Sequence, residues 1–189
     1  GLMDPVLIGP KSRVDSAASE ADIDISKWTF IDVEHSHAAA AKGAELAGKG
    51  EVESIMKGGL HTDELLHAVI VTRALMTERR LSHAYVMDIP TYHKPVVITD
   101  AAVNIAPDLD AKADILQNAI YLWHAIFGDE REPKVAILAA VEMVNAKMQA
   151  TLDAAALCKM SDRGQIVGGI LDGPLAFDNA ISRDAADSK

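Results

Sequence analysis

The sequence predicts an α/β fold whose sheets are mostly parallel and which is divided between two domains. Short apolar runs alternate with amphipathic or alanine-rich segments along the whole chain, and this is the pattern of strands connected by helices. The chain has 189 residues, of which 49% are apolar and 24% charged, so it is able to fill a core. The Arg79-Arg80 pair is the best candidate for a boundary, which gives the domain ranges 1–78 and 79–189.

Each element is expected from its own local pattern. Runs rich in Val, Ile and Leu that end at Gly, Pro or polar residues predict strands, and alanine-rich or amphipathic segments predict helices. The predicted strands span residues 5–8, 29–33, 52–56, 82–87, 94–99, 135–139 and 166–171. The predicted helices span residues 11–21, 38–47, 62–75, 110–127 and 148–160. Thr62 is the expected N-cap of its helix, and residues 88–93 suit a hairpin or a short crossing loop.

Composition argues against several classes of partner. The formal net charge is −10, so a nucleic-acid or acidic-membrane surface is not expected, since each would need a basic face. No apolar run approaches the roughly 20 residues of a membrane-spanning helix. The single cysteine, Cys158, has no partner for a disulfide within the chain, and a cytoplasmic location is therefore expected.

The first candidate site is a glycine-containing turn between a predicted strand and a predicted helix. It contains Lys57, Gly58, Gly59, His61 and Thr62. Glycines let the backbone approach a ligand closely, and the N–H groups at a helix start suit a phosphate. Lys57 would add positive charge. A tight turn with a solvated lysine explains the same residues and, from the turn alone, is the more frequent case.

Polar residues follow several other predicted strands. Asp100 and Asn104 lie where an α/β strand commonly opens onto a ligand crevice, although a capping loop for the next helix explains them equally well. The residues that share this position are Asp100, Asn104, Glu142, Asn145, Asp172 and Asp178. If all of these strands belong to one sheet, the side chains could line one of its edges.

Histidines and arginines give weaker signals. His35 and His37 lie two residues apart after a strand, and His61 and His67 flank the start of the next helix. A metal site needs three or four converging ligands, and this spacing specifies none, so no metal is expected. The arginine pair at the boundary either holds a phosphate or forms a surface charge pair. Cys158 follows three alanines and a leucine and is expected to be a small buried residue.

Seven stretches carry a more specific pattern when they are taken in order. They are PVLIGP (5–10), MKG with HTDELL (56–58 and 61–66), TERRLSH (77–83), MDIPTY (87–92), ITDAAVN (98–104), TLDAAAL (151–157) and ILDGPLAFDNAIS (170–182). Together they resemble the phosphate acetyl/butyryl transferase family, and they cover most of the chain.

The resemblance implies a fold, a reaction and a set of substrate contacts. The fold would be two αβα-sandwich domains, isocitrate/isopropylmalate dehydrogenase-like, with a cleft between them. Coenzyme A, as a co-substrate and not a bound cofactor, would attack acyl phosphate there through its thiolate, and phosphate would leave. The implied substrate-binding residues are Lys57, Gly58, Gly59, His61, Thr62, Arg80, Ser82, Asp100, Asn104, Asn145 and Asp172.

The sequence also departs from the family pattern. The family's serine–arginine pair and its aspartate base would lie after Lys189, and its first strand and helix before Gly1, so a fragment is expected in which no catalytic residue is assigned. The acetyl-specific branch tends to carry an arginine near the position of His67, and histidine there favours the butyryl-like branch. The family also implies a homodimer.

Two other functions stay open at this point. One is a catalytically incomplete module that binds coenzyme A or acyl phosphate. The other is a metal-dependent dehydrogenase of a phosphorylated hydroxy acid, with His35, His37 or His61 as ligands. Bound zinc, or loss of activity with a chelator, would favour the dehydrogenase.

Overall fold

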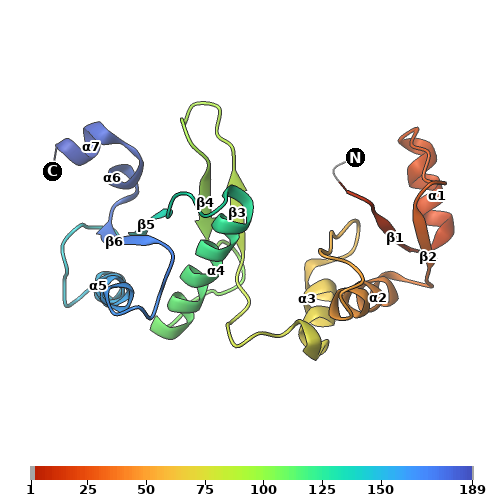
Figure 1. Cartoon of the computed structure of the whole chain (residues 1–189), viewed down its shortest axis with the longest axis horizontal. Helices are drawn as coiled ribbons and strands as arrows, with labels where there is room; N and C mark the ends of the chain where they lie inside the picture. The colour runs from red at the N-terminus through yellow and green to blue at the C-terminus, as the bar shows by residue number, and fades with distance from the viewer. Residues whose placement is uncertain (1–2, 189) are drawn as a thin grey trace. The chain divides into compact units, whose positions relative to one another are not determined.

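The structure is a computed structural model that describes residues 3–188. The chain forms two compact units, Gly1–Glu78 and Arg79–Lys189, which are coloured red to yellow and yellow-green to blue in Figure 1. Within residues 3–188 the strands form two-stranded sheets, two of them parallel and one antiparallel. This confirms the mixed α/β class with parallel sheets. The assignment of the two units as the two domains of an enzyme stays a prediction.

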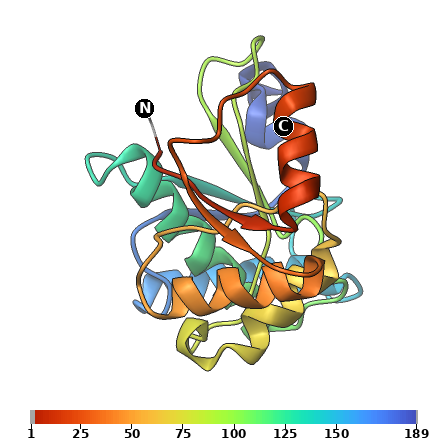
Figure 2. The same cartoon turned by 90° about the vertical axis from the view of Figure 1, so that its right-hand side faces the viewer.

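The first unit is built on a pair of parallel strands and a pair of packed helices. Its elements are β1 (Val6–Gly9), α1 (Lys11–Glu20), β2 (Thr29–Asp32), α2 (Ser36–Gly48), α3 (Thr62–Val71) and the 3-10 turn η1 (Arg73–Leu75). Val6 pairs with Thr29 and Gly9 with Asp32. Small side chains let α2 (orange) approach α3 (yellow) closely in Figure 2. The buried residues of this contact are Ala40, Ala44 and Ala68, with Leu60 and Leu75 packed against them.

One predicted strand of this unit is wrong. Residues 52–56 have irregular backbone, with no strand assigned. Val52 and Ile55 are half-buried, whereas Met56 is 82% exposed. In the sequence, a glutamate and a serine separate Val52 from Ile55, so the alternation of apolar and polar residues that a paired strand needs is absent.

The helix predicted to reach Leu75 ends earlier. Its last residue is Val71, because Thr72 leaves the helical conformation with a ψ of 86°. The Thr72 hydroxyl donates to the carbonyl of Ala68 at 2.9 Å. A threonine side chain that competes for backbone groups in this way favours the end of a helix.

The second unit contains an antiparallel hairpin, a parallel strand pair and two long helices. Its elements are β3 (Ala84–Met87), β4 (Val96–Thr99), α4 (Leu109–Phe127), β5 (Lys134–Leu138), α5 (Gln149–Asp162), β6 (Ile170–Leu175), α6 (Phe177–Ile181) and α7 (Arg183–Asp187). The strands β3 and β4 pair with Ala84 opposite Thr99, so the connection between them is the hairpin and not a crossing loop. The hairpin lies beside α4 (Figure 1).

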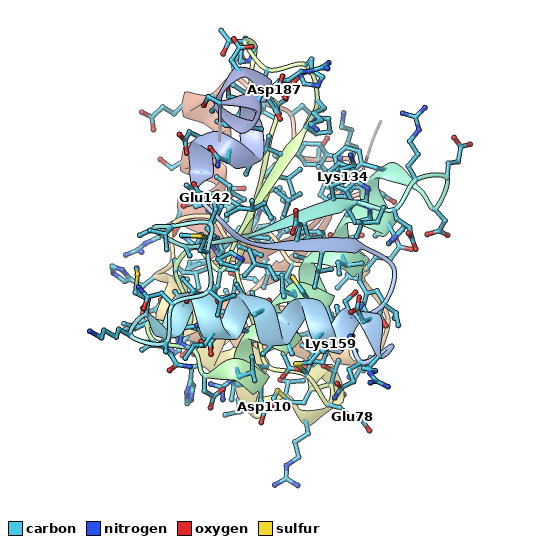
Figure 3. The ribbon with its side chains drawn as sticks, turned by 90° about the vertical axis from the view of Figure 1, so that its left-hand side faces the viewer. Glu78, Asp110, Lys134, Glu142, Lys159 and Asp187 are labelled. Carbon is cyan, nitrogen blue, oxygen red and sulfur yellow. The ribbon has the colours of Figure 1, made fainter. Side chains whose placement is uncertain are left out.

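The core of the second unit lies between α4, α5 and the β5–β6 pair. Leu116, Ile120, Leu157 and Ile166 form one buried cluster, and Leu157 has no exposed surface. Figure 3 shows α5, which carries the labelled Lys159, lying beside β5 and β6. A salt bridge between Lys112 of α4 and the buried Asp153 of α5 joins the two helices next to this core. Within residues 3–188, no helix is both long enough and apolar enough to span a membrane.

The last strand was predicted too early in the sequence. It was expected at 166–171, but β6 runs from Ile170 to Leu175. Gly168 has a φ of 80°, and this left-handed backbone separates the buried Ile166 from the strand. The strand then continues through Gly173, where an added Cβ would lie 2.8 Å from the Ile137 side chain. Glycine is needed there because the two strands approach so closely.

His124 near the end of α4 ties this helix to the backbone before β6. Its Nε2 lies 2.7 Å from the Gly168 carbonyl oxygen and its Nδ1 lies 3.3 Å from the Gly128 carbonyl oxygen. Carbonyl oxygens only accept hydrogen bonds, so the protonated ring satisfies both contacts. The Gly168 carbonyl raises the pKa of His124 above 6.5; partial burial opposes this, and Gly128, Asp129 and Glu132 add to it.

We expect this contact to make the second unit more stable in mild acid. Because the folded pKa is raised, the contribution is complete below the unfolded value near 6.5 and is lost as the pH rises through the folded pKa. Urea unfolding at about pH 5.5 and about pH 8.5 should show a smaller difference for His124→Gln than for the unchanged protein. His93→Gln, at an exposed position, is the control. Equal pH dependence in all three proteins would contradict the prediction.

Candidate functional site

The glycine-containing turn precedes α3 and is open to solvent. Lys57 is exposed and its Nζ donates to the Leu60 carbonyl at 3.2 Å, so the side chain folds back over the turn. His61 occupies the N-cap position and Thr62 is the first helical residue, which corrects the prediction of Thr62 as the cap. Within residues 3–188 no side chain caps this helix, and its first N–H groups can therefore bond to water or to a ligand.

The two glycines of this turn are not required by the fold of residues 3–188. Neither Gly58 nor Gly59 has a positive φ, and no heavy atom of that range lies within 4 Å of the position of an added Cβ. A tight turn that only glycine can form does not explain them. The turn instead presents accessible backbone, as contact with a ligand would require.

The starts of α2 and α3 are joined through one carboxylate. His35 caps α2 by accepting a hydrogen bond from the Ala38 N–H at 3.1 Å. The Ser36 hydroxyl donates to Oε1 of Glu64 at 3.3 Å, and His37 Nε2 lies 3.2 Å from the same oxygen. A carboxylate is stabilised between two helix starts because both carry partial positive charge. His35 and His37 thus have structural partners within their own unit.

A second set of candidate residues is assembled around the Asp100 side chain. Its carboxylate accepts from the backbone N–H groups of Ala102 and Val103 at 3.1 Å each, and from that of Asn104 at 3.0 Å. It also accepts from the Asn104 side chain and, at 3.3 Å, from the N–H of His83. The peptide bond before Asp100 is cis. One carboxylate therefore folds the loop after β4 onto the segment before β3.

These contacts change the acidity of Asp100. Partial burial raises its pKa, but the hydrogen bonds from the Asn104 side chain and from the N–H groups of Val103, Ala102 and Asn104 outweigh burial and lower the pKa to about 2. Hydrogen bonds to the charged form of a carboxyl group have this effect. Near neutral pH, Asp100 is therefore a charged structural acceptor that is poorly suited to act as a general base.

Arg80 and Ser82 belong to the same assembly. Asn104 Nδ2 donates to the Leu81 carbonyl at 3.0 Å, which connects the loop after β4 to the Arg80–Ser82 segment. On the other side, this segment is held by α4, where Asn118 contacts the Ser82 hydroxyl. The structure thus brings together four of the predicted residues, Arg80, Ser82, Asp100 and Asn104, in the second unit.

The remaining candidates of the second unit lie elsewhere. Asn145 is exposed in the loop after β5, where its side chain accepts from the Lys147 N–H at 2.9 Å and its backbone N–H donates to Thr151. Asp172 is exposed within β6 and does not follow the strand, because that strand continues to Leu175. Glu142, which is labelled in Figure 3, accepts a hydrogen bond from the Asn179 side chain at 3.0 Å.

The prediction that these polar residues share one sheet edge is wrong. Asp100 and Asn104 follow β4 of the antiparallel hairpin, Asn145 follows β5 of a different sheet, and Asp178 lies in α6. Five candidates, Lys57 to Thr62, belong to the first unit, and the other six belong to the second. The two groups are thus held by separate units of the chain.

Metal-binding and thiol chemistry receive little support from the side chains. Of the residues that the structure describes, no three His, Cys, Asp or Glu side chains are grouped so that they could hold a metal ion. Burial raises the pKa of the Cys158 thiol, and Asp172 and Asp162 add to this. Its Sγ lies 3.7 Å from the Gly173 carbonyl. A thiol in this environment packs as a small residue and reacts slowly.

Comparison with solved structures identifies the fold. A branched-chain phosphotransacylase from Enterococcus faecalis V583 matches with a TM-score of 0.77 and 24% identity, over 98% of this chain and 73% of that structure. A phosphotransacetylase from Staphylococcus aureus matches with a TM-score of 0.76 and 19% identity, over 98% of this chain and 64% of that structure. At these identities the match shows that the fold is that of a phosphotransacylase.

Comparison of sequences then gives the family. The model of the phosphate acetyl/butaryl transferase family matches residues 35–189, and the chain belongs to this family. A phosphate acetyltransferase of Rhizobium meliloti is 54% identical over 98% of this chain and 58% of its own length. A phosphate butyryltransferase of Clostridium acetobutylicum is 40% identical over the whole chain and 62% of its own length. The chain therefore spans a little more than half the length of the curated relatives it matches.

Proposed function

We propose that the protein containing this chain is a phosphate acyltransferase, which transfers a short acyl group reversibly between coenzyme A and orthophosphate. Family membership carries the proposal, because relatives named for both acetyl and butyryl transfer match along nearly the whole chain. In the forward direction the coenzyme A sulfur forms a bond to the acyl carbon, the bond from that carbon to the phosphate oxygen breaks, and orthophosphate leaves. The thiol proton passes to a base that is not assigned to any residue of this chain.

The finer fold and the place of the substrates also belong to this proposal. The two units would be parts of two αβα-sandwich domains of the isocitrate/isopropylmalate dehydrogenase type. The open turn at Lys57 to Thr62 and the assembly around Asp100 would each contribute substrate contacts. Both have the chemistry for it, since one presents a helix start with a lysine and the other an exposed arginine with a serine.

The proposal also includes the assembly and the location of the protein. A homodimer follows from the resemblance to the family, and exposed apolar side chains such as Tyr85 and Val86 of β3 are compatible with it. A cytoplasmic location follows from the single cysteine, because such a chain needs no oxidising compartment.

The test is thioester formation by the purified full-length protein. Coenzyme A would be supplied with acetyl, propionyl or butyryl phosphate in turn. Higher identity to the acetyltransferase of Rhizobium meliloti favours acetyl phosphate, whereas His67 in α3 favours butyryl phosphate, so the assay ranks the two. Absence of thioester with all three substrates would contradict acyl transfer. Calorimetric binding of coenzyme A by an inactive protein would then identify the alternative, a binding module.

Within this function, Lys57→Ala is expected to lower kcat/KM for acyl phosphate about tenfold, because the variant loses a positive charge beside an anionic substrate. The unfolding transition should stay unchanged, since the side chain is exposed and makes one bond to a carbonyl. Lys49→Ala is the matched control, because Lys49 is also an exposed lysine of the first unit but is paired with Glu45. Equal kinetics of the two variants would remove Lys57 from the site.

A chelator should leave turnover unchanged, and inhibition would instead favour the dehydrogenase alternative.

A further inference from the structure

Asn118 in the middle of α4 holds the segment from Arg79 to Ser82 with one side chain. Its Oδ1 accepts from the Arg79 Nε at 2.9 Å, and its Nδ2 donates to the Arg80 carbonyl at 2.8 Å and to the Ser82 hydroxyl oxygen at 2.9 Å. The amide orientation is determined by these neighbours, because a guanidinium only donates and a carbonyl only accepts. Three of the four hydrogen-bonding positions of the amide are used on a segment 36 to 39 residues away in the sequence.

Asp114, one turn earlier on the same helix, completes the attachment. Its Oδ2 accepts from the Arg80 N–H at 2.9 Å. Both backbone groups of Arg80 are therefore bonded to α4, whereas its exposed guanidinium has no ion-pair partner among residues 3–188. Arg79 differs from its neighbour, because its guanidinium is bonded to Asn118 and lies 4.7 Å from the centre of the Tyr121 ring. Arg80 is thus the arginine of this pair that is left for a ligand.

The bond from Asn118 also determines what Ser82 can do. A hydroxyl group has one hydrogen to donate and lone pairs to accept with. The amide of Asn118 donates to the Ser82 oxygen, so the hydroxyl hydrogen is left to donate elsewhere, and it forms no hydrogen bond to the part of the chain that the structure describes. A guanidinium and a hydroxyl donor two residues apart are the groups that bind phosphate oxygens.

We propose that Asn118 is a positioning residue that holds Arg80 and Ser82 as paired donors to a phosphate group of the substrate. The inference rests on the proposed acyl transfer and goes beyond it by assigning a role to a residue outside the sequence motifs. This phosphate group belongs either to acyl phosphate and orthophosphate or to coenzyme A. The two sources are distinguished by which substrate's KM rises in the Asn118 variants.

The test compares Asn118→Ala and Asn118→Asp with the unchanged full-length protein. The alanine variant loses all three bonds. The aspartate variant keeps the oxygen that accepts from Arg79. Opposite Ser82, however, a carboxylate oxygen replaces the amide N–H donor, so the Ser82 hydroxyl hydrogen turns towards α4. Both variants are expected to raise KM for the phosphate-bearing substrate about tenfold, the effect of one misplaced hydrogen bond, with a smaller change in kcat.

Gln117→Ala is the matched control. Gln117 is the neighbouring residue of α4, and its side chain also makes two bonds to a distant segment, to the Val167 carbonyl at 3.0 Å and the Val167 N–H at 2.9 Å. The Gln117→Ala variant should lower the unfolding midpoint at least as much as Asn118→Ala does, because Gln117 is buried. It should leave KM unchanged.

Three outcomes decide the proposal. A rise in KM for acyl phosphate alone supports it and assigns the phosphate to that substrate, whereas a rise for coenzyme A alone supports it with the other assignment. KM values equal to those of Gln117→Ala overturn it.

If the unchanged protein forms no thioester, the proposed function fails by itself. Calorimetric binding of inorganic phosphate and of coenzyme A then tests Asn118 without turnover, and affinities of Asn118→Ala equal to those of the unchanged protein for both ligands overturn the role.

Discussion

Replacing Asp100 with alanine is expected to lower both the stability of the second unit and the turnover of the proposed acyl transfer. The carboxylate is the common acceptor for the backbone N–H groups of His83, Ala102, Val103 and Asn104, and alanine leaves these donors without it. Each of the four lost bonds costs about 1 kcal/mol where the donors can reach water, so a decrease of about 4 kcal/mol in the free energy of unfolding is expected. Misplacement of the Ser82 segment should reduce kcat/KM about a hundredfold.

Urea unfolding and the thioester assay measure the two effects on the same protein. Asp110→Ala provides the control, because Asp110 is an exposed aspartate in the first turn of α4. It should cost less than about 1 kcal/mol through the helix dipole alone and leave turnover intact. If Asp100→Ala resembles this control in both measurements, the carboxylate does not organise the loop.

The pH dependence of the unchanged protein gives an independent check on Asp100. Its folded pKa of about 2 lies below the ordinary value of 3.8, so its stabilising contribution is present above that value and is lost as the pH falls towards 2. Asp153 acts in the same direction, since the hydrogen bond from Lys112 lowers its pKa. Asp100→Ala should therefore lose less stability than the unchanged protein between about pH 5 and about pH 2.

Most helices could be predicted because local signals and packing agree. The helix α4 begins where Asp108 accepts from the Ala111 N–H at 2.8 Å, and it ends at Gly128, whose φ is 80°. Both are signals that a sequence displays. The helix has an apolar stripe, which carries the buried Ile115, Leu116 and Ile120.

The misplaced last strand shows where local signals fail. The Gly173-Pro174 pair indicates the end of a strand by ordinary rules, yet β6 passes through both residues. The strand tolerates them because β5 approaches so closely at Ile137 that a side chain would not fit, and the register shifts between Ala136 and Leu138. Such an approach depends on two segments more than 30 residues apart, which local patterns do not report.

The candidate site divides in the same way. Asp100 and the turn at Lys57 could be found because polar residues and glycines after a strand or before a helix are visible in the sequence. Asn118 and Asp114 were missed, since on a helix with an apolar stripe they look like ordinary solvent-facing residues. Their importance comes from the segment that lies against them, and that contact spans more than 30 residues of sequence.

Leu157→Ala is the second change for which a large effect is expected. Leu157 lies in α5 with no exposed surface, in contact with the core cluster of Leu116, Ile120 and Ile166. Alanine removes apolar atoms and leaves a cavity that a close-packed core fills only in part, so the free energy of unfolding should fall by about 3 kcal/mol. Urea denaturation with an unchanged m-value would show that stability, and not the compactness of the denatured state, has changed.

The matched control makes the same chemical change at a different degree of burial. Leu138 at the end of β5 is 49% exposed, so Leu138→Ala should cost about 1 kcal/mol, since half of the side chain is already in water. If the two variants lose equal stability, the cluster around Leu157 does not form the core of the second unit. Leu157→Ala can instead lose more stability than Leu138→Ala while its KM values for coenzyme A and acyl phosphate stay unchanged. In that case the core stabilises α4 but does not determine the geometry of the residues that Asn118 holds. Substrate contacts are then controlled by the polar attachments of that helix and not by its packing.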